Sequence, residues 1–238
     1  RLHDPHMSPQ TLDSIVGELT GRGRFTNLKL CTVVVGAYGR QRRWKHAMHF
    51  MAMLRQKGLT LNIITYNVAM SVCEKAAQWQ VAVLFMHELQ GAKMEAHVIT
   101  YSTLISACAK GKRWQEALGL LAAMQQGRLE PNMVTVNAGI SAFEKGEQWQ
   151  RALALFAAGK SNTIELDITT FGSVMSAVEK GAQWQQALGM LEVMCWSRIQ
   201  LNVIMCSGGI SACEKEHEWQ QSLGLLAATQ EAGLEADL

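Results

Sequence analysis

Six cations recur along the 238-residue chain at a fixed interval of 35 residues. They are Arg40, Lys75, Lys110, Lys145, Lys180 and Lys215. Cations repeated at one interval could neutralise successive phosphate groups of a polyanion. The formal net charge is only +2, so such a partner must be argued from where the cations lie and not from the total charge.

The other reactive side chains give no sign of catalysis. The six cysteines form no CxxC pair, which predicts reduced thiols rather than a zinc site or a disulfide framework. Cys73, Cys108 and Cys213 recur at one place in the interval and fit small core residues. His46 and His49 have no obvious third ligand, which favours a solvated pair over a metal site. Because a catalytic cluster would break the periodicity, the sequence predicts no enzyme, no metal and no cofactor.

The elements that carry these residues form an internal repeat. Six tryptophans share the interval: Trp44, Trp79, Trp114, Trp149, Trp184 and Trp219. If this tryptophan is placed at position 17, six repeats follow one another without gaps. They cover residues 28–62, 63–97, 98–132, 133–167, 168–202 and 203–237. Each repeat is therefore expected to be one supersecondary unit.

Within a repeat, apolar residues at positions 4, 8 and 11 have the spacing of one helix face, as in Tyr101, Ile105 and Cys108. A basic residue at position 13, followed in three repeats by glycine at position 14, predicts the end of this helix A. Positions 17, 21 and 24 predict a second helix, helix B. The fold class is then all-α, a right-handed α-solenoid of stacked helix-turn-helix hairpins.

Composition and the N-terminal segment agree with such a stack. The chain is 48% hydrophobic and 18% charged, which predicts a packed core, and no apolar run approaches the roughly 18 to 20 residues of a membrane span. Residues 1–27 are expected to be a partial repeat or a capping helix. That helix should cover about residues 9–20 and begin at Ser8-Pro9 in the N-cap and N1 manner.

One side of helix A is left over once its core face is assigned. At about 100° per residue, positions 2, 5 and 13 form a second stripe that faces away from positions 4, 8 and 11. Position 13 holds the six cations, and position 2 holds four aliphatic residues: Ile64, Ile99, Val134 and Ile204. The alternative for the cations is that they only complement the helix dipole. Exposed aliphatic groups beside small polar groups and cations instead favour single-stranded nucleic acid.

Glutamate at position 12 opposes this interpretation. It occurs in four repeats, as Glu74, Glu144, Glu179 and Glu214. By helix geometry it lies near position 5 on the exposed side, where a carboxylate would repel phosphate.

These residues resemble the pentatricopeptide repeat family over residues 28–237, as a P-type-like array of about six repeats. The resemblance is carried by the period of 35, by starts such as Ile64-Thr65-Tyr66-Asn67, by Trp-x-x-Ala-Leu in helix B and by Pro-Asn or Leu-Asp endings. The tetratricopeptide repeat has a period of 34 and a Gly-plus-Tyr signature that is not seen here.

The resemblance implies that each repeat reads one RNA base through positions 5 and 35. By the family's rule, Thr32 with Asn62 and Ser102 with Asn132 imply A, Asn137 with Asp167 implies U, and Ser207 with Asp237 implies G. Asn67 with His97 and Gly172 with Asn202 depart from the rule. The position 2 aliphatics would sandwich the bases, and the position 13 cations would bind phosphates.

The expected function is therefore a sequence-selective single-stranded RNA-binding adaptor in organellar RNA metabolism, in a mitochondrion or a plastid, with protein subunits of a larger complex as further partners and no membrane insertion. No targeting segment is visible after Arg1. The alternative is a non-catalytic protein-interaction scaffold subunit of a larger organellar ribonucleoprotein or membrane-protein assembly. The low net charge and the position 12 glutamates favour that alternative.

Overall fold

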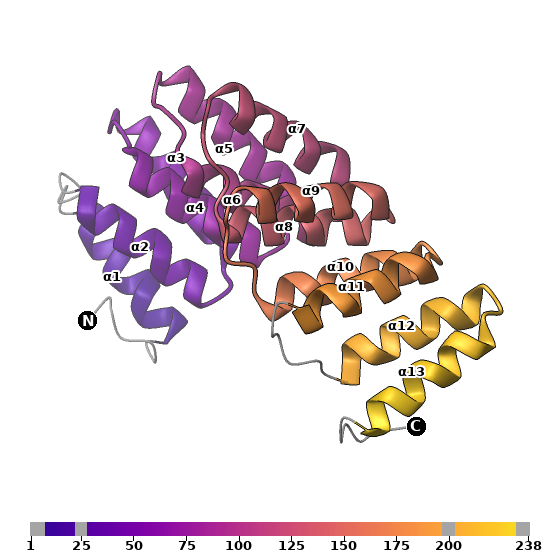
Figure 1. Cartoon of the computed structure of the whole chain (residues 1–238). Coiled ribbons are helices and arrows are strands. Elements are labelled where there is room, and N and C mark those ends of the chain that lie inside the picture. The colour runs from indigo at the N-terminus through magenta and orange to yellow at the C-terminus, as the bar shows by residue number, and fades with distance from the viewer. Residues whose placement is uncertain (1–7, 22–27, 197–202, 232–238) are drawn as a thin grey trace. The chain divides into compact units, whose positions relative to one another are not determined.

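The computed structural model describes residues 8–21, 28–196 and 203–231, and within these ranges it contains 13 helices and no strand. The helices are α1 (Pro9–Gly21), α2 (Leu28–Arg40), α3 (Trp44–Gln56), α4 (Ile63–Lys75), α5 (Trp79–Gly91), α6 (Val98–Lys110), α7 (Trp114–Gln126), α8 (Met133–Lys145), α9 (Trp149–Ser161), α10 (Ile168–Lys180), α11 (Trp184–Trp196), α12 (Val203–Lys215) and α13 (Trp219–Glu231). Each repeat supplies one helix A, beginning at position 1, and one helix B, beginning at the tryptophan. Figure 1 shows them as consecutive helix pairs.

The helices belong to two compact units. The first comprises residues 1–111 and 120–129, and the second comprises residues 112–119 and 130–238. In the first unit α2, α4 and α6 contact one another in turn, and in the second unit α8, α10 and α12 do the same. Within each unit, every helix A therefore packs on the helix A of the next repeat, which is the stacking expected of a solenoid.

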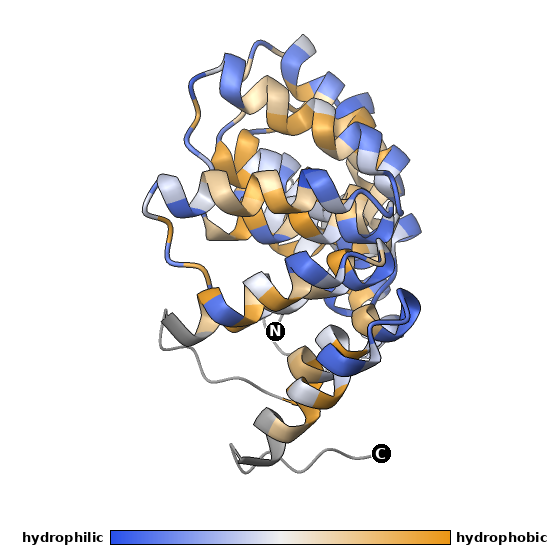
Figure 2. Ribbon diagram, turned by 45° about the vertical axis from the view of Figure 1, so that its right-hand side comes forward, coloured by the Kyte–Doolittle hydropathy of each residue, from blue (hydrophilic) through white to orange (hydrophobic). Residues whose placement is uncertain are grey.

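The core face of helix A is the predicted one. In α4, Tyr66, Met70 and Cys73 at positions 4, 8 and 11 are buried. Cys108 and Cys213, like Cys73, are buried core residues as expected. Figure 2 shows that apolar residues lie mostly along the helices and that the turns between them are mostly hydrophilic.

The predicted face of helix B was right at position 24 and wrong at positions 17 and 21. In α5 the buried residues include Ala82, Met86 and Leu89 at positions 20, 24 and 27, whereas Val83 at position 21 is only half-buried. The tryptophan at position 17 is also half-buried in five repeats, and Trp219 is exposed. The alanine at position 20 explains this difference, because a small side chain lets helix B approach its neighbours closely. A membrane-spanning helix would need more length and more apolar character than any described helix has.

Helix A ends where the sequence predicted, but glycine does not supply the left-handed residue. The C-cap glycines have ordinary negative φ angles of −81° at Gly111, −93° at Gly146 and −77° at Gly181. After helix A, the residues with positive φ stand at position 15: Arg42, Ala77, Lys112, Glu147, Ala182 and His217.

The glycine instead makes room for a tryptophan of the preceding repeat. A Cβ added to Gly181 would collide with Cδ1 of Trp149 and lie 2.7 Å from its Cγ. The same relation joins Gly111 to Trp79 and Gly146 to Trp114. In these three pairs of repeats, the recurring tryptophan and the glycine are therefore two sides of one contact.

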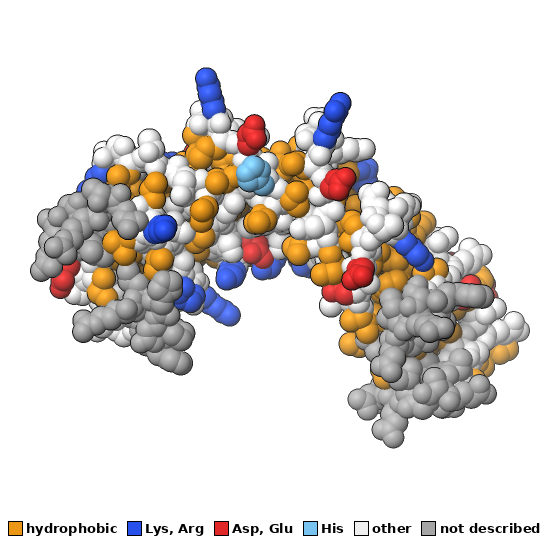
Figure 3. All heavy atoms as spheres, turned by 60° about the vertical axis from the view of Figure 1, so that its left-hand side comes forward, with side chains coloured by type: hydrophobic (Ala, Val, Ile, Leu, Met, Phe, Trp, Pro, Cys, Tyr) orange, Lys and Arg blue, Asp and Glu red, His pale blue; other side chains and the backbone are white. Residues whose placement is uncertain are grey.

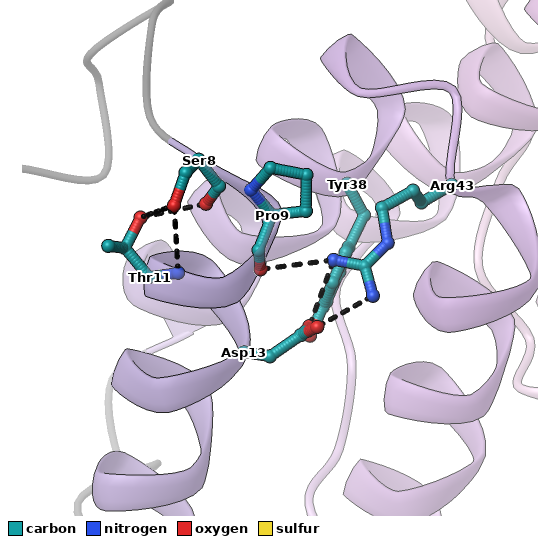
Figure 4. A network of polar contacts seen from close by, with 6 residues as sticks. All are labelled: Ser8, Pro9, Thr11, Asp13, Tyr38 and Arg43. Atoms are coloured by element: carbon teal, nitrogen blue, oxygen red, sulfur yellow. Dashed lines mark hydrogen bonds and ion pairs between the residues drawn. The ribbon is translucent and has the colours of Figure 1, made fainter.

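Helix α1 begins at Pro9, 35 residues before α3, and so continues the helix B series toward the N-terminus. Ser8 caps it as predicted, since its Oγ accepts a hydrogen bond from the Thr11 backbone N–H at 3.3 Å. Figure 4 shows how α1 is fixed to the first repeat. Arg43 donates two hydrogen bonds to Asp13, at 3.0 and 2.7 Å, and Tyr38 donates one at 3.2 Å.

Candidate nucleic-acid interface

The aliphatic side chains at position 2 are exposed, as the sequence predicted. The exposed fractions are 60% for Ile64, 65% for Ile99, 55% for Val134 and 77% for Ile204. Each follows the first residue of its helix A, so it lies at the N-terminal end of that helix. Large apolar groups exposed at the same place in successive repeats suit a partner with flat apolar faces.

Position 5 is held between repeats and not directed wholly to solvent. Asn137 in α8 donates from Nδ2 to Oδ1 of Asp167 at 3.2 Å, and its Oδ1 accepts a hydrogen bond from Thr170 Oγ1. Asp167 is the N-cap of α10 and accepts from the Thr170 backbone N–H at 2.9 Å. The expected pair, Asn137 and Asp167, is thus brought together, and its geometry is fixed by the first turn of the next repeat.

The charge of Asp167 is stabilised by the same contacts. Burial raises the pKa of this carboxyl group, but hydrogen bonds from Thr169, Thr170 and Asn137 outweigh burial and bring the pKa down to about 2. Asp167 is therefore an anion at physiological pH. All of these hydrogen bonds involve Oδ1, and no hydrogen bond to Oδ2 is described.

The first repeat joins its two expected residues through a threonine. Thr32 Oγ1 and Thr65 Oγ1 are 2.8 Å apart, and Thr65 donates to Oδ1 of Asn62 at 2.8 Å. In the second repeat Asn67 accepts from Thr100 at 2.8 Å, while His97 is exposed and makes no side-chain cap bond to α6. In the second repeat, the residue at position 5 therefore bonds to the next repeat as in the first and fourth repeats, but the residue at position 35 does not cap the next helix A.

The remaining expected residues belong to the other three repeats. Ser102 donates to backbone carbonyls of its own helix, and Asn132 caps α8; the two belong to different units. Gly172 has only a methyl group near it, because a Cβ added there would lie 3.9 Å from Cε of Met205. Ser207 is exposed. Asn202 and Asp237 lie outside the described residues.

Sequence reasoning missed the residue that organises these contacts. It is the threonine at position 3, present in four repeats as Thr65, Thr100, Thr135 and Thr170, each with no exposed surface. A buried hydroxyl group must find a hydrogen-bond partner, and position 5 of one repeat and position 35 of the same repeat supply partners for the threonine of the next. The recurrence of a polar residue beside the core stripe was the available clue.

All six cations at position 13 are exposed, as predicted, but three of the lysines have acidic partners. Lys110 Nζ lies 2.6 Å from Glu74 Oε1, Lys180 Nζ lies 2.5 Å from Glu144 Oε1, and Lys215 Nζ lies 3.4 Å from Glu179 Oε1. The glutamates were expected beside position 5 of their own repeat. They instead reach the lysine of the next repeat. On the face seen in Figure 3, basic side chains are scattered among apolar and acidic ones.

In the part of the chain that the structure describes, no group of three or more His, Cys, Asp or Glu side chains could hold a metal ion. His46 and His49 are both exposed on α3. His46 stacks on Tyr38 with ring centroids 5.8 Å apart.

These features define a class of protein: an all-α helical-repeat protein whose hairpins present one polar and aliphatic edge of helix A. Comparison with known families gives the particular family. Residues 14–76 match the pentatricopeptide repeat domain, and residues 96–145 match the PPR repeat family. Both matched segments thus carry pentatricopeptide repeats, which confirms the resemblance expected from the sequence. No curated protein sequence matches it.

Solved structures of the family confirm the all-α solenoid fold. A crystal structure of the pentatricopeptide repeat protein PPR10 in complex with an 18-nucleotide psaJ RNA element matches with a TM-score of 0.62 and 23% identity, covering 88% of this chain and 29% of that chain. The PPR domain of Arabidopsis thaliana protein-only RNase P 1, in complex with tRNA, matches with a TM-score of 0.64 and 13% identity, covering 79% of this chain and 95% of that chain. The chain thus spans less than a third of the length of PPR10.

Proposed function

We propose that this protein binds single-stranded RNA along the exposed edges of its A helices, with one base per repeat. Bases would lie against the aliphatic groups at position 2, and positions 5 and 35 would contact their edges. The described repeats would act as a non-catalytic adaptor in organellar RNA metabolism, and imaging of the tagged protein against mitochondrial and plastid markers tests that location.

The single observation that carries the proposal is the arrangement of Asn137 and Asp167 next to Val134. The amide of Asn137 cannot rotate freely, because Thr170 holds its oxygen and Asp167 holds its nitrogen. Nδ2 of Asn137 also donates to Thr169 Oγ1, at 3.5 Å, so a base would compete with Thr169 for the second N–H, while Oδ2 of Asp167 remains as a fixed acceptor. Uracil offers a carbonyl oxygen and an N–H side by side, which is the complementary pattern. The solved complexes of PPR10 and of protein-only RNase P 1 with RNA support the same class of partner.

The test replaces Asn137 with Ser, which changes the pair to the Ser-with-Asp type for which the family's rule gives G. Two RNAs embed 5′-A-U-A-X-N-G-3′ and differ only at X, the fourth base, which is U in one and G in the other and faces this repeat. They compete for wild type and for Asn137→Ser. The preference should move from U toward G by about 1 kcal/mol, the lower end of what one good base contact discriminates. An unchanged ratio would refute base reading by this repeat, and the assignments in the other repeats would be withdrawn with it.

A second candidate function is a protein-interaction scaffold. The pairing of Lys110, Lys180 and Lys215 with glutamates favours it, because a paired lysine attracts phosphate less than an unpaired one. Failure to bind single-stranded RNA at low salt would favour the scaffold over the adaptor.

A further inference from the structure

The position 12 glutamates pair with lysines that an RNA-binding surface would otherwise use. We propose that Glu74, Glu144 and Glu179 silence the lysines of the repeats that follow them, meaning that the ion pairs keep these lysines from binding phosphate. Among the five lysines, only Lys75 and Lys145 then bind the RNA backbone. This inference rests on the proposed function and specifies which cations serve it.

Each glutamate is held by two groups of the next helix A. Glu144 Oε1 accepts from Lys180 Nζ at 2.5 Å and from Ser176 Oγ at 3.1 Å. Glu74 is held in the same way by Lys110 and Ser106, at 2.6 and 2.9 Å. Glu179 is held by Ser211 at 2.9 Å and by Lys215, whose Nζ also donates to the Glu179 carbonyl oxygen at 3.0 Å.

The glutamates are fixed more firmly than the lysines that they bind. Their side chains are 18%, 16% and 29% exposed, whereas the paired lysines are 41%, 42% and 43% exposed. A phosphate that approached one of these lysines would find the lysine Nζ already bound to the glutamate carboxylate. The lysine would have to exchange one anion for another, so the net gain would be small.

Two repeats receive no such glutamate. The residue at position 12 before Lys75 is Gly39, and the residue before Lys145 is Ala109. Gly39 is packed so closely that an added Cβ would collide with Cγ2 of Val72. Among the described residues no ion pair involves Lys75 or Lys145, and both side chains are exposed. One such lysine belongs to each of the two units.

The consequence is a shallow salt dependence. Each phosphate contact on a single strand contributes about −0.7 to the slope of log affinity against log salt. Five lysines would contribute about −3.5, and Lys75 with Lys145 alone would contribute about −1.4. Freeing the three silenced lysines should therefore steepen the slope by about −2.

The experiment measures binding of a short fluorescein-labelled oligouridylate to the full chain by anisotropy over a series of potassium chloride concentrations. The triple variant Glu74→Gln, Glu144→Gln, Glu179→Gln should bind more tightly at low salt and show the steeper slope. Glutamine retains an oxygen that can accept from the serine at position 9, and an ion pair at the surface contributes little to folding, so the repeats should remain stacked. Far-UV circular dichroism checks this.

Glu214→Gln is the matched control, because Glu214 stands at the same position but no described lysine follows it in a further repeat. It removes the same charge and should leave the slope unchanged. In a double-mutant cycle, Glu144→Gln should lose its effect when Lys180 is Gln. Lys75→Gln and Lys145→Gln should each reduce the slope by about 0.7 in magnitude, whereas Lys180→Gln should change it little.

The outcomes separate this inference from the proposed function. If wild type does not bind the oligouridylate at low salt, both fail. If wild type binds but the triple variant has the wild-type slope, or if Glu214→Gln has the same effect per charge as Glu144→Gln, RNA binding stands and the silencing by glutamate is refuted.

Discussion

Replacing Gly181 with Ala tests the contact that joins successive repeats. The added Cβ would lie 2.7 Å from Cγ and 3.0 Å from Nε1 of Trp149, and closer still to Cδ1. These atoms all belong to the rigid indole ring. The ring or the helix must therefore shift, and overpacking of this kind costs about 1 to 3 kcal/mol.

A smaller effect acts in the other direction. The φ and ψ of Gly181, −77° and 1°, are accessible to alanine, and the loss of glycine's freedom in the unfolded chain stabilises by about 0.4 to 1 kcal/mol. The expected net result is a loss of about 1 to 2 kcal/mol. Gly189 in α11 is the control, because an added Cβ there meets nothing within 4 Å; Gly189→Ala should stabilise by up to about 1 kcal/mol.

The assay is urea denaturation followed by far-UV circular dichroism. Because helical-repeat arrays can unfold in parts, hydrogen exchange in α9 and α10 localises the loss. In a Trp149→Ala background the obstacle is gone, so Gly181→Ala should become neutral or stabilising. The reasoning fails if Gly181→Ala is as stable as wild type, or if its cost is the same with and without the tryptophan ring.

Three further changes probe the contacts around the candidate site and α1. Thr170→Val keeps the shape but leaves Asn137 Oδ1 without its donor, so urea denaturation should show a loss of about 1 to 3 kcal/mol; a neutral result would contradict the buried hydrogen bonds. The Asp167 pKa of about 2 lies below that of an unfolded chain, so the stability difference between wild type and Asp167→Asn should be constant above about pH 5 and shrink as pH falls from there toward 2. A difference that changes between pH 5 and 7 would show that another group is responsible. The hydrogen bond from Arg43 lowers the pKa of Asp13, and Asp13→Asn should increase hydrogen exchange in α1 while leaving α10 unchanged; equal exchange in α1 would show that Arg43 does not hold this helix.

The repeat and the bounds of its helices could be predicted from the sequence because one tryptophan and one cation recur at a constant interval. The contacts between repeats could not, because they depend on how far one helix A is shifted along the next. Lys180 bonds to Glu144, which is 36 residues earlier. Helix periodicity within one repeat does not predict a contact between two repeats. The same holds for Thr170 and Asn137. The sequence identified residues that lie together at the edge of helix A, and the stagger of the helices decided which of them bond.

The residue at position 35 combines a structural role in helix capping with a proposed role in RNA recognition. Asn62, Asn132 and Asp167 each accept the hydrogen bond that starts the next helix A, and in the proposed function the same side chain faces a base. The residue types that can occupy this position are therefore limited to the few whose side chains can cap a helix, whatever the base to be recognised. Redesign of specificity at this position would alter the stability of the neighbouring repeat, while position 5 could be changed with less effect on helix initiation. His97, which makes no side-chain cap bond, marks the junction where this constraint has already been relaxed.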